Sequence, residues 1–450
     1  MKQLIQKYNV PGPRYTSYPT VPYWDDETFS VNRWKATITN TFNPEYPVSL
    51  YIHLPFCESL CTFCACNKRI TKRHEVEMPY IKAVLKELDL YSELYGYKLT
   101  LQEIHLGGGT PTFFSPENLD HLLSEVFKRT LTASSVSFSF EGHPNNTTKA
   151  HFEVLRSYNF DRVSFGIQDY NPEVQQAIHR IQPFKNVEYV TNTAREIGFT
   201  SVGHDLIYGL PFQTVEHVVE TIEKTIQLKP DRIAFYSYAH TPWIKGNGQR
   251  GFDTKDLPSA ETKRLQYEIG KKLLEENGYV EVGMDHFALP SDALCKAMQS
   301  KTLHRNFMGY TIQNTKHLIG LGVSSISDAW FGFAQNEKKL EDYYKRLAED
   351  KLPVFRGHIL TPEDLEIRKH ILNLMTRFET DLSKTSLSEQ TVNHILNRLK
   401  EFVHDDLIEV IDNKIILNPE AKAYVRNICM AFDLRLQRKK PETELFSMTI

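Results

Sequence analysis

Strand-like and helix-like segments alternate along the first half of this chain, and this alternation limits the folds it can adopt. Strand patterns occur at 48–55, 103–106, 136–140, 162–167, 201–207 and 233–238. Helix patterns occur at 78–95, after Ser115, and from about Lys149, Val187 and Val215. Repeated strand–helix units require a parallel sheet. Six such units predict an α/β fold, a partial (β/α)6 barrel that stays open, with its chemistry at the C-terminal ends of the strands.

Polar residues recur where these predicted strands end. The glycine-rich stretch 107–112 follows the second strand, and Glu141, Gln168 and Asp205 lie at the ends of the third, fourth and fifth. A tight turn or a helix N-cap would explain each one alone. Their recurrence at one rim favours a binding site. The stretch GGGTPT has neither the dinucleotide nor the P-loop spacing, so we do not interpret it as either.

Four of the six cysteines lie within ten residues, directly after the first strand: Cys57, Cys61, Cys64 and Cys66. Crowded thiols in a reducing compartment bind metals or carry redox chemistry more often than they form disulfides. A structural zinc site needs four ligands, usually from two separated pairs, and no second pair follows here. Cys295 and Cys429 stand alone, and we expect both in the core. Three thiolates can hold three irons of a [4Fe-4S] cluster and leave the fourth iron open to a ligand.

The first strand itself alternates. Ser49, Tyr51 and His53 share one face, and apolar residues occupy the other face. This pattern is typical of a strand with helices outside and a polar cavity inside. His53 is either a hydrogen-bonded core histidine or a residue next to the cysteine cluster that helps to orient its ligands.

Charge and hydropathy exclude several partners. The 450 residues carry 53 basic and 56 acidic side chains, a net charge of −3. A nucleic-acid or membrane-surface protein usually has a basic excess. The sequence has no apolar run near the roughly 18 residues of a membrane span, and residues 1–10 lack a hydrophobic signal core. We therefore expect a cytoplasmic protein with no nucleic-acid or membrane partner.

The pattern changes after about Thr361. Helices are predicted from Thr361, near Ser388 and from Ala421, with a hairpin at 407–417 between the last two. This order predicts a mostly helical, winged-helix-like C-terminal domain. DNA binding is disfavoured by the acidic stretch 401–409. We divide the chain into an N-terminal segment 1–47, a barrel 48–290, a connecting region 291–360 and the C-terminal domain 361–450.

The stretch CESLCTFCACN, with YIHLPFC before it and GGGTPT after it, resembles the radical S-adenosylmethionine (SAM) superfamily. Further stretches resemble the oxygen-independent coproporphyrinogen III oxidases over nearly the whole length. They are GPRYTSYPT (12–20), the extra Cys66, DLIYGLP (205–211), GMDHFA (283–288), HRNF (304–307) and RNICMAFD (426–433).

This resemblance implies a [4Fe-4S] cluster bound by Cys57, Cys61 and Cys64, with Cys66 outside the ligand set. It implies one SAM at the open iron, in contact with Tyr51, Phe63, Gly108, Gly109, Thr110, Glu141, Gln168, Arg180, Asp205, Ala239 and Ile326. A second SAM would lie next to Phe307. Two departures from the family pattern stand out. Met308 replaces a frequent glutamine, which puts the second-SAM contact in doubt, and Glu141 is followed by Gly142 and His143.

The implied reaction converts two propionates of coproporphyrinogen III to vinyl groups, giving protoporphyrinogen IX in haem biosynthesis. A 5′-deoxyadenosyl radical would abstract the hydrogen, so no side chain is assigned as catalytic. The family further implies a one-electron donor such as flavodoxin or ferredoxin, and a monomer. The carboxylates of the substrate call for arginines. Arg14 and Arg305 are the candidates, followed by Arg180, Lys68 and Arg69, although an ordinary ion pair would explain each one.

Three alternatives remain open from the sequence. A haem chaperone on the same barrel would bind the cluster and SAM without decarboxylation, but that group generally lacks Cys66 and the GPRYTSYPT stretch. A radical enzyme that methylates haem or opens its ring is favoured slightly by Met308. A zinc-stabilised winged-helix regulator would contain zinc and no iron or sulfide.

Overall fold

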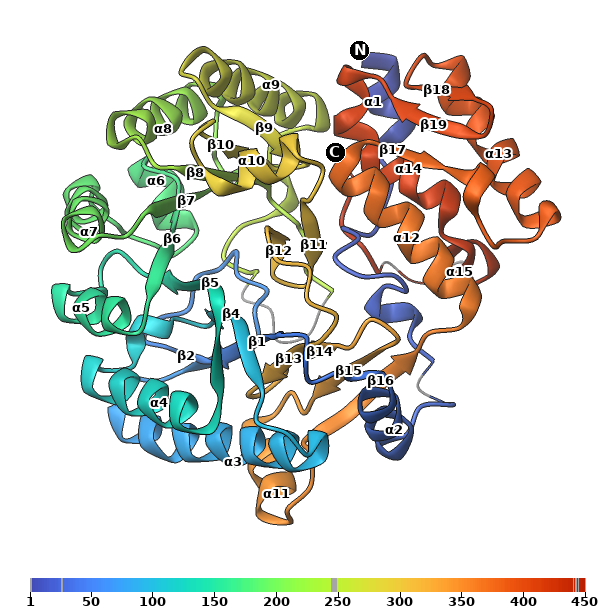
Figure 1. Cartoon of the computed structure of the whole chain (residues 1–450). Coiled ribbons are helices and arrows are strands. Elements are labelled where there is room, and N and C mark those ends of the chain that lie inside the picture. The colour runs from blue at the N-terminus through green and yellow to red at the C-terminus, as the bar shows by residue number, and fades with distance from the viewer. Residues whose placement is uncertain are drawn as a thin grey trace.

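A computed structural model describes residues 2–25, 27–243, 249–439, 441, 443 and 445–449. Within these residues one large sheet has the strand order β16-β15-β14-β13-β1-β4-β5-β6-β7-β8-β10-β9. Figure 1 shows the sheet curling around a central space, with helices on its outer side. A smaller unit made from the C-terminal residues lies beside it.

The centre of the sheet consists of the six strands expected from the sequence. They are β1 (Val48–Leu54), β4 (Thr100–Gly108), β5 (Leu131–Gly142), β6 (Phe160–Gln168), β7 (Ser201–Tyr208) and β8 (Arg232–Ser237). Neighbours in this series pair in parallel throughout. The prediction of a partial (β/α)6 barrel is therefore confirmed, and β5 is longer than expected because it begins at Leu131.

Further strands, antiparallel except for β13, extend the sheet on both sides, and sequence analysis did not find them. β13 (Leu318–Leu321) pairs in parallel with β1, and β14 (Ile326–Asp328), β15 (Gly332–Asn336) and β16 (Val354–Ile359) follow in antiparallel order. On the other side, β10 (His286–Ala288) and β9 (Val280–Gly283) follow β8. Among the described residues no pairing joins β9 to β16, so the barrel stays open.

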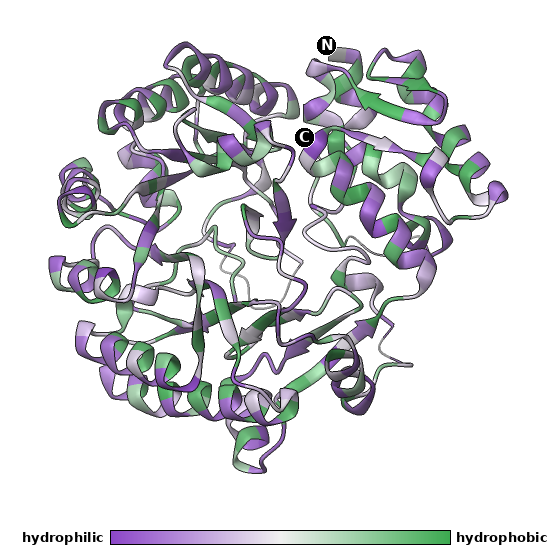
Figure 2. Cartoon of the chain, viewed as in Figure 1, coloured by the Kyte–Doolittle hydropathy of each residue, from purple (hydrophilic) through white to green (hydrophobic). Residues whose placement is uncertain are grey.

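Amphipathic helices cover the outside of the sheet. They are α3 (Glu77–Tyr95), α4 (Pro116–Arg129), α5 (Lys149–Ser157), α7 (Phe184–Ile197), α8 (Val215–Leu228), α9 (Ala260–Glu276), α10 (Ala293–Gln299) and α11 (Leu340–Ala348). The short α6 (Pro172–Ala177) instead lies beside the cysteine loop. In α4, for example, Ser115 caps the N-terminus, and Leu119, Leu122 and Val126 are buried at helical spacing. Figure 2 shows the mixture of hydrophobic and hydrophilic stretches that this one-sided burial produces.

The C-terminal domain combines helices with a small sheet. Its elements are α12 (Pro362–Arg377), β17 (Glu379–Asp381), α13 (Glu389–His404), β18 (Ile408–Ile411), β19 (Lys414–Leu417), α14 (Val425–Phe432) and α15 (Leu434–Arg438). The predicted hairpin is present, with its turn at Asp412 and Asn413 in the left-handed region. The single last helix predicted from Ala421 is wrong. Residues Pro419–Tyr424 form a 3₁₀ helix, and the chain breaks again at Asp433, whose side chain caps α15.

The N-terminal segment divides between the two units. Ile5 and Tyr8 of α1 (Lys2–Tyr8) belong to the core of the C-terminal domain, and Tyr8 stacks on Phe402 at 5.1 Å. α2 (Val31–Thr41) instead buries Trp34 and Ile38 in the core of the barrel. The domain boundaries given above stay a prediction. No described helix is both long enough and apolar enough to cross a membrane.

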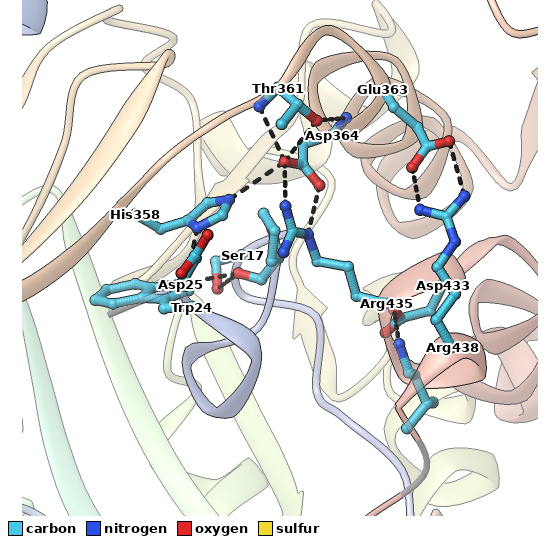
Figure 3. Close-up of polar contacts among 12 residues, drawn as sticks. Ser17, Trp24, Asp25, His358, Thr361, Glu363, Asp364, Asp433, Arg435 and Arg438 are labelled. Atoms are coloured by element: carbon cyan, nitrogen blue, oxygen red, sulfur yellow. Dashed lines mark hydrogen bonds and ion pairs between the residues drawn. The ribbon is translucent and has the colours of Figure 1, made fainter. Parts of the chain in front are cut away.

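A polar network joins the two units at the start of α12. Asp364 accepts hydrogen bonds from Arg435 on α15 at 2.7 Å and from the Nε2 of His358 on β16 at 3.2 Å. The Nδ1 of His358 accepts from the backbone N–H of Asp25. Figure 3 shows these side chains converging from three separate parts of the chain.

Candidate functional site

A cavity of about 630 Å³ opens at the C-terminal ends of the parallel strands. Its lining combines the cysteine loop, the turn after β4 and the ends of β5 to β8. Predicted site residues in this lining are Cys57, Cys61, Phe63, Cys64, Gly108, Gly109, Thr110, Glu141, Gln168, Arg180 and Asp205. Residues that are far apart in sequence meet here because parallel strands end at the same edge of a sheet.

The cysteine loop is held at both of its ends. β2 (Phe56–Cys57) pairs in parallel with β3 (Arg69–Ile70), so the chain returns to its starting point after the last cysteine. In the middle of the loop, Thr62 donates from its backbone N–H to the carbonyl of Ile178 and from its hydroxyl to Ala177. The thiols are therefore presented from an anchored loop.

Hydroxyl and cationic groups surround the thiols. Thr110 Oγ1 lies 3.4 Å from Cys57 Sγ, and Arg180 donates to Cys61 Sγ at 3.7 Å. A hydrogen bond from Cys66 and the charge of Lys68 lower the pKa of Cys64, whereas the same hydrogen bond raises the pKa of Cys66. Burial raises the pKa of Cys57 to about 11. Cys64 is therefore held as a thiolate more readily than Cys57 or Cys66.

These residues fit an iron–sulfur cluster. All six cysteines of the chain are free thiols in the structure. Among the described residues, no three His, Cys, Asp or Glu side chains gather closely enough to hold one metal ion. A [4Fe-4S] cluster does not need that arrangement, because each thiolate binds a different iron.

Two glycines let the turn after β4 approach the cysteine loop closely. A Cβ on Gly109 would lie 2.6 Å from the backbone of Pro55. Gly108 has φ +116, and a Cβ there would lie 2.7 Å from the ring of His53. Backbone N–H groups of this turn bond to the strand before the loop, Gly109 to Leu54 and Thr110 to Phe56. At its two glycines the turn therefore presents backbone alone to the cavity.

Two carboxylates in the cavity have opposite electrostatic environments. Burial raises the pKa of Glu141, but hydrogen bonds from His105 Nε2 at 3.3 Å and Gly108 N at 3.2 Å outweigh burial and lower it. Burial and the charge of Glu141 raise the pKa of Asp205 to about 7, against the opposing charge of Arg180. Glu141 is therefore an acceptor, and Asp205 can donate a hydrogen bond near neutral pH.

Arg180 and Gln168 form the side of the cavity at the end of β6. Arg180 donates to the carbonyl of Gly166 at 2.5 Å, in addition to its contact with Cys61. Gln168 has a left-handed backbone, with φ +70. A Cβ on Gly166 would lie 2.5 Å from the Gln168 amide, so this glycine leaves space for both side chains. The guanidinium of Arg180 therefore contacts a thiol of the cysteine loop, and its charge acts on Asp205.

A second cavity of about 310 Å³ adjoins the first and shares Cys66, Gly108 and Glu141 with it. The predicted residues Tyr51, Phe307 and Ile326 line it, together with Met308. The structure therefore brings the residue assigned to a second SAM next to the residues assigned to the first.

Three predicted residues lie outside both cavities. The carbonyl of Ala239 accepts a hydrogen bond from Gln249. Arg14 pairs with Asp285 at 3.4 Å and donates to the carbonyl of Ser237 at 2.8 Å. Arg305 is buried, stacks on Tyr310 and donates to the carbonyl of Arg14. The two arginines are neighbours, but neither lines the cavity that holds the cysteines.

Sequence analysis missed three polar residues inside the barrel. His105 bonds to Glu141, and Arg162 donates to Ser139, which in turn contacts His105. Tyr236 lines the first cavity at the end of β8. Strand alternation could have found His105, because it shares a face of β4 with Glu103 and Gly107. Nothing in the sequence alone pairs it with Glu141.

The open parallel barrel and the three-cysteine loop define a radical SAM protein. Consistent with this class, residues 51–225 match the sequence model of the Radical SAM superfamily.

Full-length relatives narrow the assignment. The chain is 39% identical over 443 residues to the oxygen-independent coproporphyrinogen III oxidase of Helicobacter pylori (strain ATCC 700392 / 26695), covering 96% of each chain. It is 37% identical to that of Escherichia coli (strain K12), covering 99% of this chain and 98% of the relative. The solved structure of coproporphyrinogen III oxidase (HemN) from Escherichia coli, a radical SAM enzyme, superposes with a TM-score of 0.90 at 35% identity, covering 96% and 98% of the two chains. The chain belongs to the oxygen-independent coproporphyrinogen III oxidase family.

Membership in this family confirms three predictions made from the sequence. The chain is a radical SAM oxidoreductase, its cofactors are a [4Fe-4S] cluster and SAM, and its place is in porphyrin and haem biosynthesis. The winged-helix regulator that contains zinc is thereby excluded.

Proposed function

We propose that this chain catalyses the oxidative decarboxylation of two propionates of coproporphyrinogen III to vinyl groups, without oxygen, giving protoporphyrinogen IX. One observation carries the proposal. One cavity brings together three cysteines, two glycines of the turn after β4, two carboxylates and Arg180. The chain that forms this cavity is similar over nearly its full length to oxygen-independent coproporphyrinogen III oxidases.

Cys57, Cys61 and Cys64 hold the cluster in this proposal, and Cys66 does not. Lys68 supports the same arrangement, because its ammonium donates to the carbonyls of Cys64 and Cys66 at 3.0 and 3.3 Å. Its positive charge lowers the pKa of Cys64 and so favours the thiolate that iron requires.

SAM occupies the first cavity in this proposal. Glu141 accepts hydrogen bonds from hydroxyl groups of SAM, and Asp205 and Gln168 hydrogen-bond to its neighbouring polar groups. Arg180 pairs with the carboxylate of SAM. Gly108, Gly109 and Thr110 offer backbone polar groups, while Tyr51, Phe63 and Ile326 supply further contacts in the two cavities. Ala239 lines neither cavity and is proposed as a contact from the chain just after β8. When bound, the cluster and SAM supply a 5′-deoxyadenosyl radical able to remove hydrogen from an unactivated carbon. The protein's own task is to orient the groups and exclude water.

A second SAM is proposed in the adjoining cavity, against Phe307. The substrate carboxylates are assigned to Arg14 and Arg305, whose charges both act on the phenol of Tyr236 in the cavity wall. Lys68 and Lys72 line the same cavity as Tyr236 and offer two further cations.

We also propose that the protein is a cytoplasmic monomer that has no nucleic-acid or membrane partner. It would receive electrons from a flavodoxin-type or ferredoxin-type donor.

The cluster assignment and the activity can be tested together. We expect anaerobically reconstituted protein, given SAM, reductant and coproporphyrinogen III, to form 5′-deoxyadenosine and the vinyl product. Cys64→Ser should lose bound iron and sulfide together with both products, because the cluster then has two thiolates left. The matched control is Cys66→Ser, which should keep the iron and sulfide content of the wild type.

Two results would contradict the proposal. Full turnover by Cys64→Ser would refute the ligand assignment. Wild-type protein with an intact cluster that cleaves SAM but forms no vinyl product would refute the reaction and favour a haem chaperone or a haem-modifying enzyme.

A further inference from the structure

A row of polar side chains crosses the inner face of the barrel below the cavity. The strand register places Tyr51 opposite His105, His105 opposite Ser139, and Ser139 opposite Arg162. The sequence SFSFE in β5 explains the row. Ser137, Ser139 and Glu141 face inward at every second position, while Phe138 and Phe140 are buried in the core outside.

The hydrogen bonds along this row run in one direction. The guanidinium of Arg162 can only donate, and it donates to Ser139 Oγ at 2.9 Å. His105 Nδ1 lies 2.8 Å from the same oxygen, and its Nε2 lies 3.3 Å from Glu141 Oε1. An ionised carboxylate can only accept, so Nε2 must carry a hydrogen. In a neutral imidazole Nδ1 is then an acceptor, and it takes the one hydrogen that Ser139 offers.

Glu141 is fixed at both oxygens as a result. Oε1 accepts from His105 and Oε2 accepts from the backbone N–H of Gly108 at 3.2 Å. The carboxylate keeps 44% of its side-chain surface exposed, in the lining of the first cavity. Tyr51 lies nearly parallel to the ring of His105, with centroids 5.9 Å apart, and so restrains its plane.

Arg162 gives the row its direction. Its two terminal nitrogens donate to Ser137 Oγ at 3.2 Å and to Ser139 Oγ at 2.9 Å. Because a guanidinium has no acceptor, the hydroxyl hydrogen of Ser139 cannot bond to it and is left for His105 Nδ1.

We propose that Arg162, Ser139 and His105 are positioning residues that keep Glu141 ionised and oriented to accept hydrogen bonds from the vicinal hydroxyls of a bound nucleoside. The inference rests on the proposed function, because the nucleoside is that of SAM. Ser137 offers a matched control, because it bonds to the same arginine but not to His105.

The first test follows the imidazole of His105 by nitrogen NMR in full-length protein labelled at histidine, with His105→Gln used for assignment. The neutral ring of the wild-type protein should carry its hydrogen on Nε2. Ser139→Ala should shift the Nδ1 resonance, because this nitrogen loses its hydrogen-bond donor, whereas Ser137→Ala should behave as wild type. A hydrogen on Nδ1 of the neutral wild-type ring would overturn the proposal.

The second test measures the affinity of the reconstituted protein for SAM. Ser139→Ala should raise the Kd about tenfold, and Ser137→Ala should change it less than about twofold. His105→Gln keeps a donor near the position of Nε2, so it should bind SAM more tightly than His105→Leu. If wild-type protein binds SAM but the two serine variants change the Kd equally, the positioning role of Arg162, Ser139 and His105 is refuted and the proposed function is not. A wild type that binds no SAM would refute the proposed function.

Discussion

Glu141 and Asp205 line the same cavity, yet their pKa values move in opposite directions. Burial raises both. Glu141 accepts hydrogen bonds from His105 and Gly108, and these favour its charged form. Among the described residues no donor bonds to the Asp205 carboxyl, and the charge of Glu141 acts against its ionisation. One carboxylate accepts and the other donates because of their neighbours, and not because of their residue type.

Asp205→Asn tests this difference through stability. The pKa of Asp205 is raised to about 7 in the folded protein, so its contribution to stability is full below the unfolded pKa near 4. That contribution is lost as pH rises through about 7, roughly 4 kcal/mol at about 1.4 kcal/mol per pKa unit. Urea unfolding of SAM-free protein should show a fall in unfolding free energy from about pH 5 to about pH 8 that is much smaller in Asp205→Asn. Equal slopes would contradict the assignment.

At the scale of elements, sequence periodicity predicted the six parallel strands and the helices α3, α4, α5, α7 and α8, because each has an apolar pattern along its length. It missed the strands that extend the sheet, β9, β10 and β13 to β16, which have three to six residues and leave too few positions for a pattern. Local sequence patterns also predicted the site only in part. Residues at the strand ends were predicted as a group, but the bonds from Arg162 through Ser139 to His105 depend on strand register.

Glu87 shows how a helix is held against the extended sheet. This buried carboxylate of α3 accepts from Gly322 N at 2.8 Å, Asn336 Nδ2 at 2.6 Å and Tyr343 Oη of α11 at 2.7 Å. Burial raises its pKa to about 7, although all three donors lower it. One side chain therefore joins α3, α11 and two positions in or beside the added strands.

Tyr343→Phe should weaken this junction. Loss of a hydrogen bond to a buried carboxylate should lower the unfolding free energy by about 1.5–3 kcal/mol. The loss should be larger at about pH 8 than at about pH 6, because the missing donor favoured the ionised form of Glu87. Tyr344→Phe is the control, since Tyr344 is only partly buried in the neighbouring position. Chemical denaturation of both variants would decide, and similar losses would exclude a specific role for Tyr343.

At the scale of the whole molecule, the two ends of the chain are joined to each other and to the barrel. Arg426 of α14 donates to the carbonyls of Gly12, Pro13, Met448 and Thr449. Asp364 links α12, α15 and β16, and His358 continues the contact to Asp25 (Figure 3). None of these long-range contacts has a local sequence signature. They nevertheless fix the N-terminal segment, with Arg14, beside the ends of β7 and β8.

Asp364→Asn should therefore loosen the C-terminal domain. Burial raises the pKa of Asp364, but hydrogen bonds from His358, Arg435 and Thr361 outweigh burial and hold it well below its usual range. This stabilisation is present above the unfolded pKa near 4 and is lost as pH falls through the lower folded value. The variant leaves Arg435 without its anion and should lose about 3–5 kcal/mol near neutral pH.

The adjacent pair supplies the control for this prediction. Glu363 bonds to Arg438 at the surface, with 34% and 61% of the two side chains exposed. Because water screens that pair, Glu363→Gln should cost less than about 1 kcal/mol. Unfolding monitored at about pH 7 and about pH 2.5 should show that the deficit of Asp364→Asn is large at the higher pH and shrinks at the lower, while Glu363→Gln stays close to wild type at both. A deficit of Asp364→Asn that is the same at both pH values would mean that packing, and not the charge of Asp364, holds the two units together.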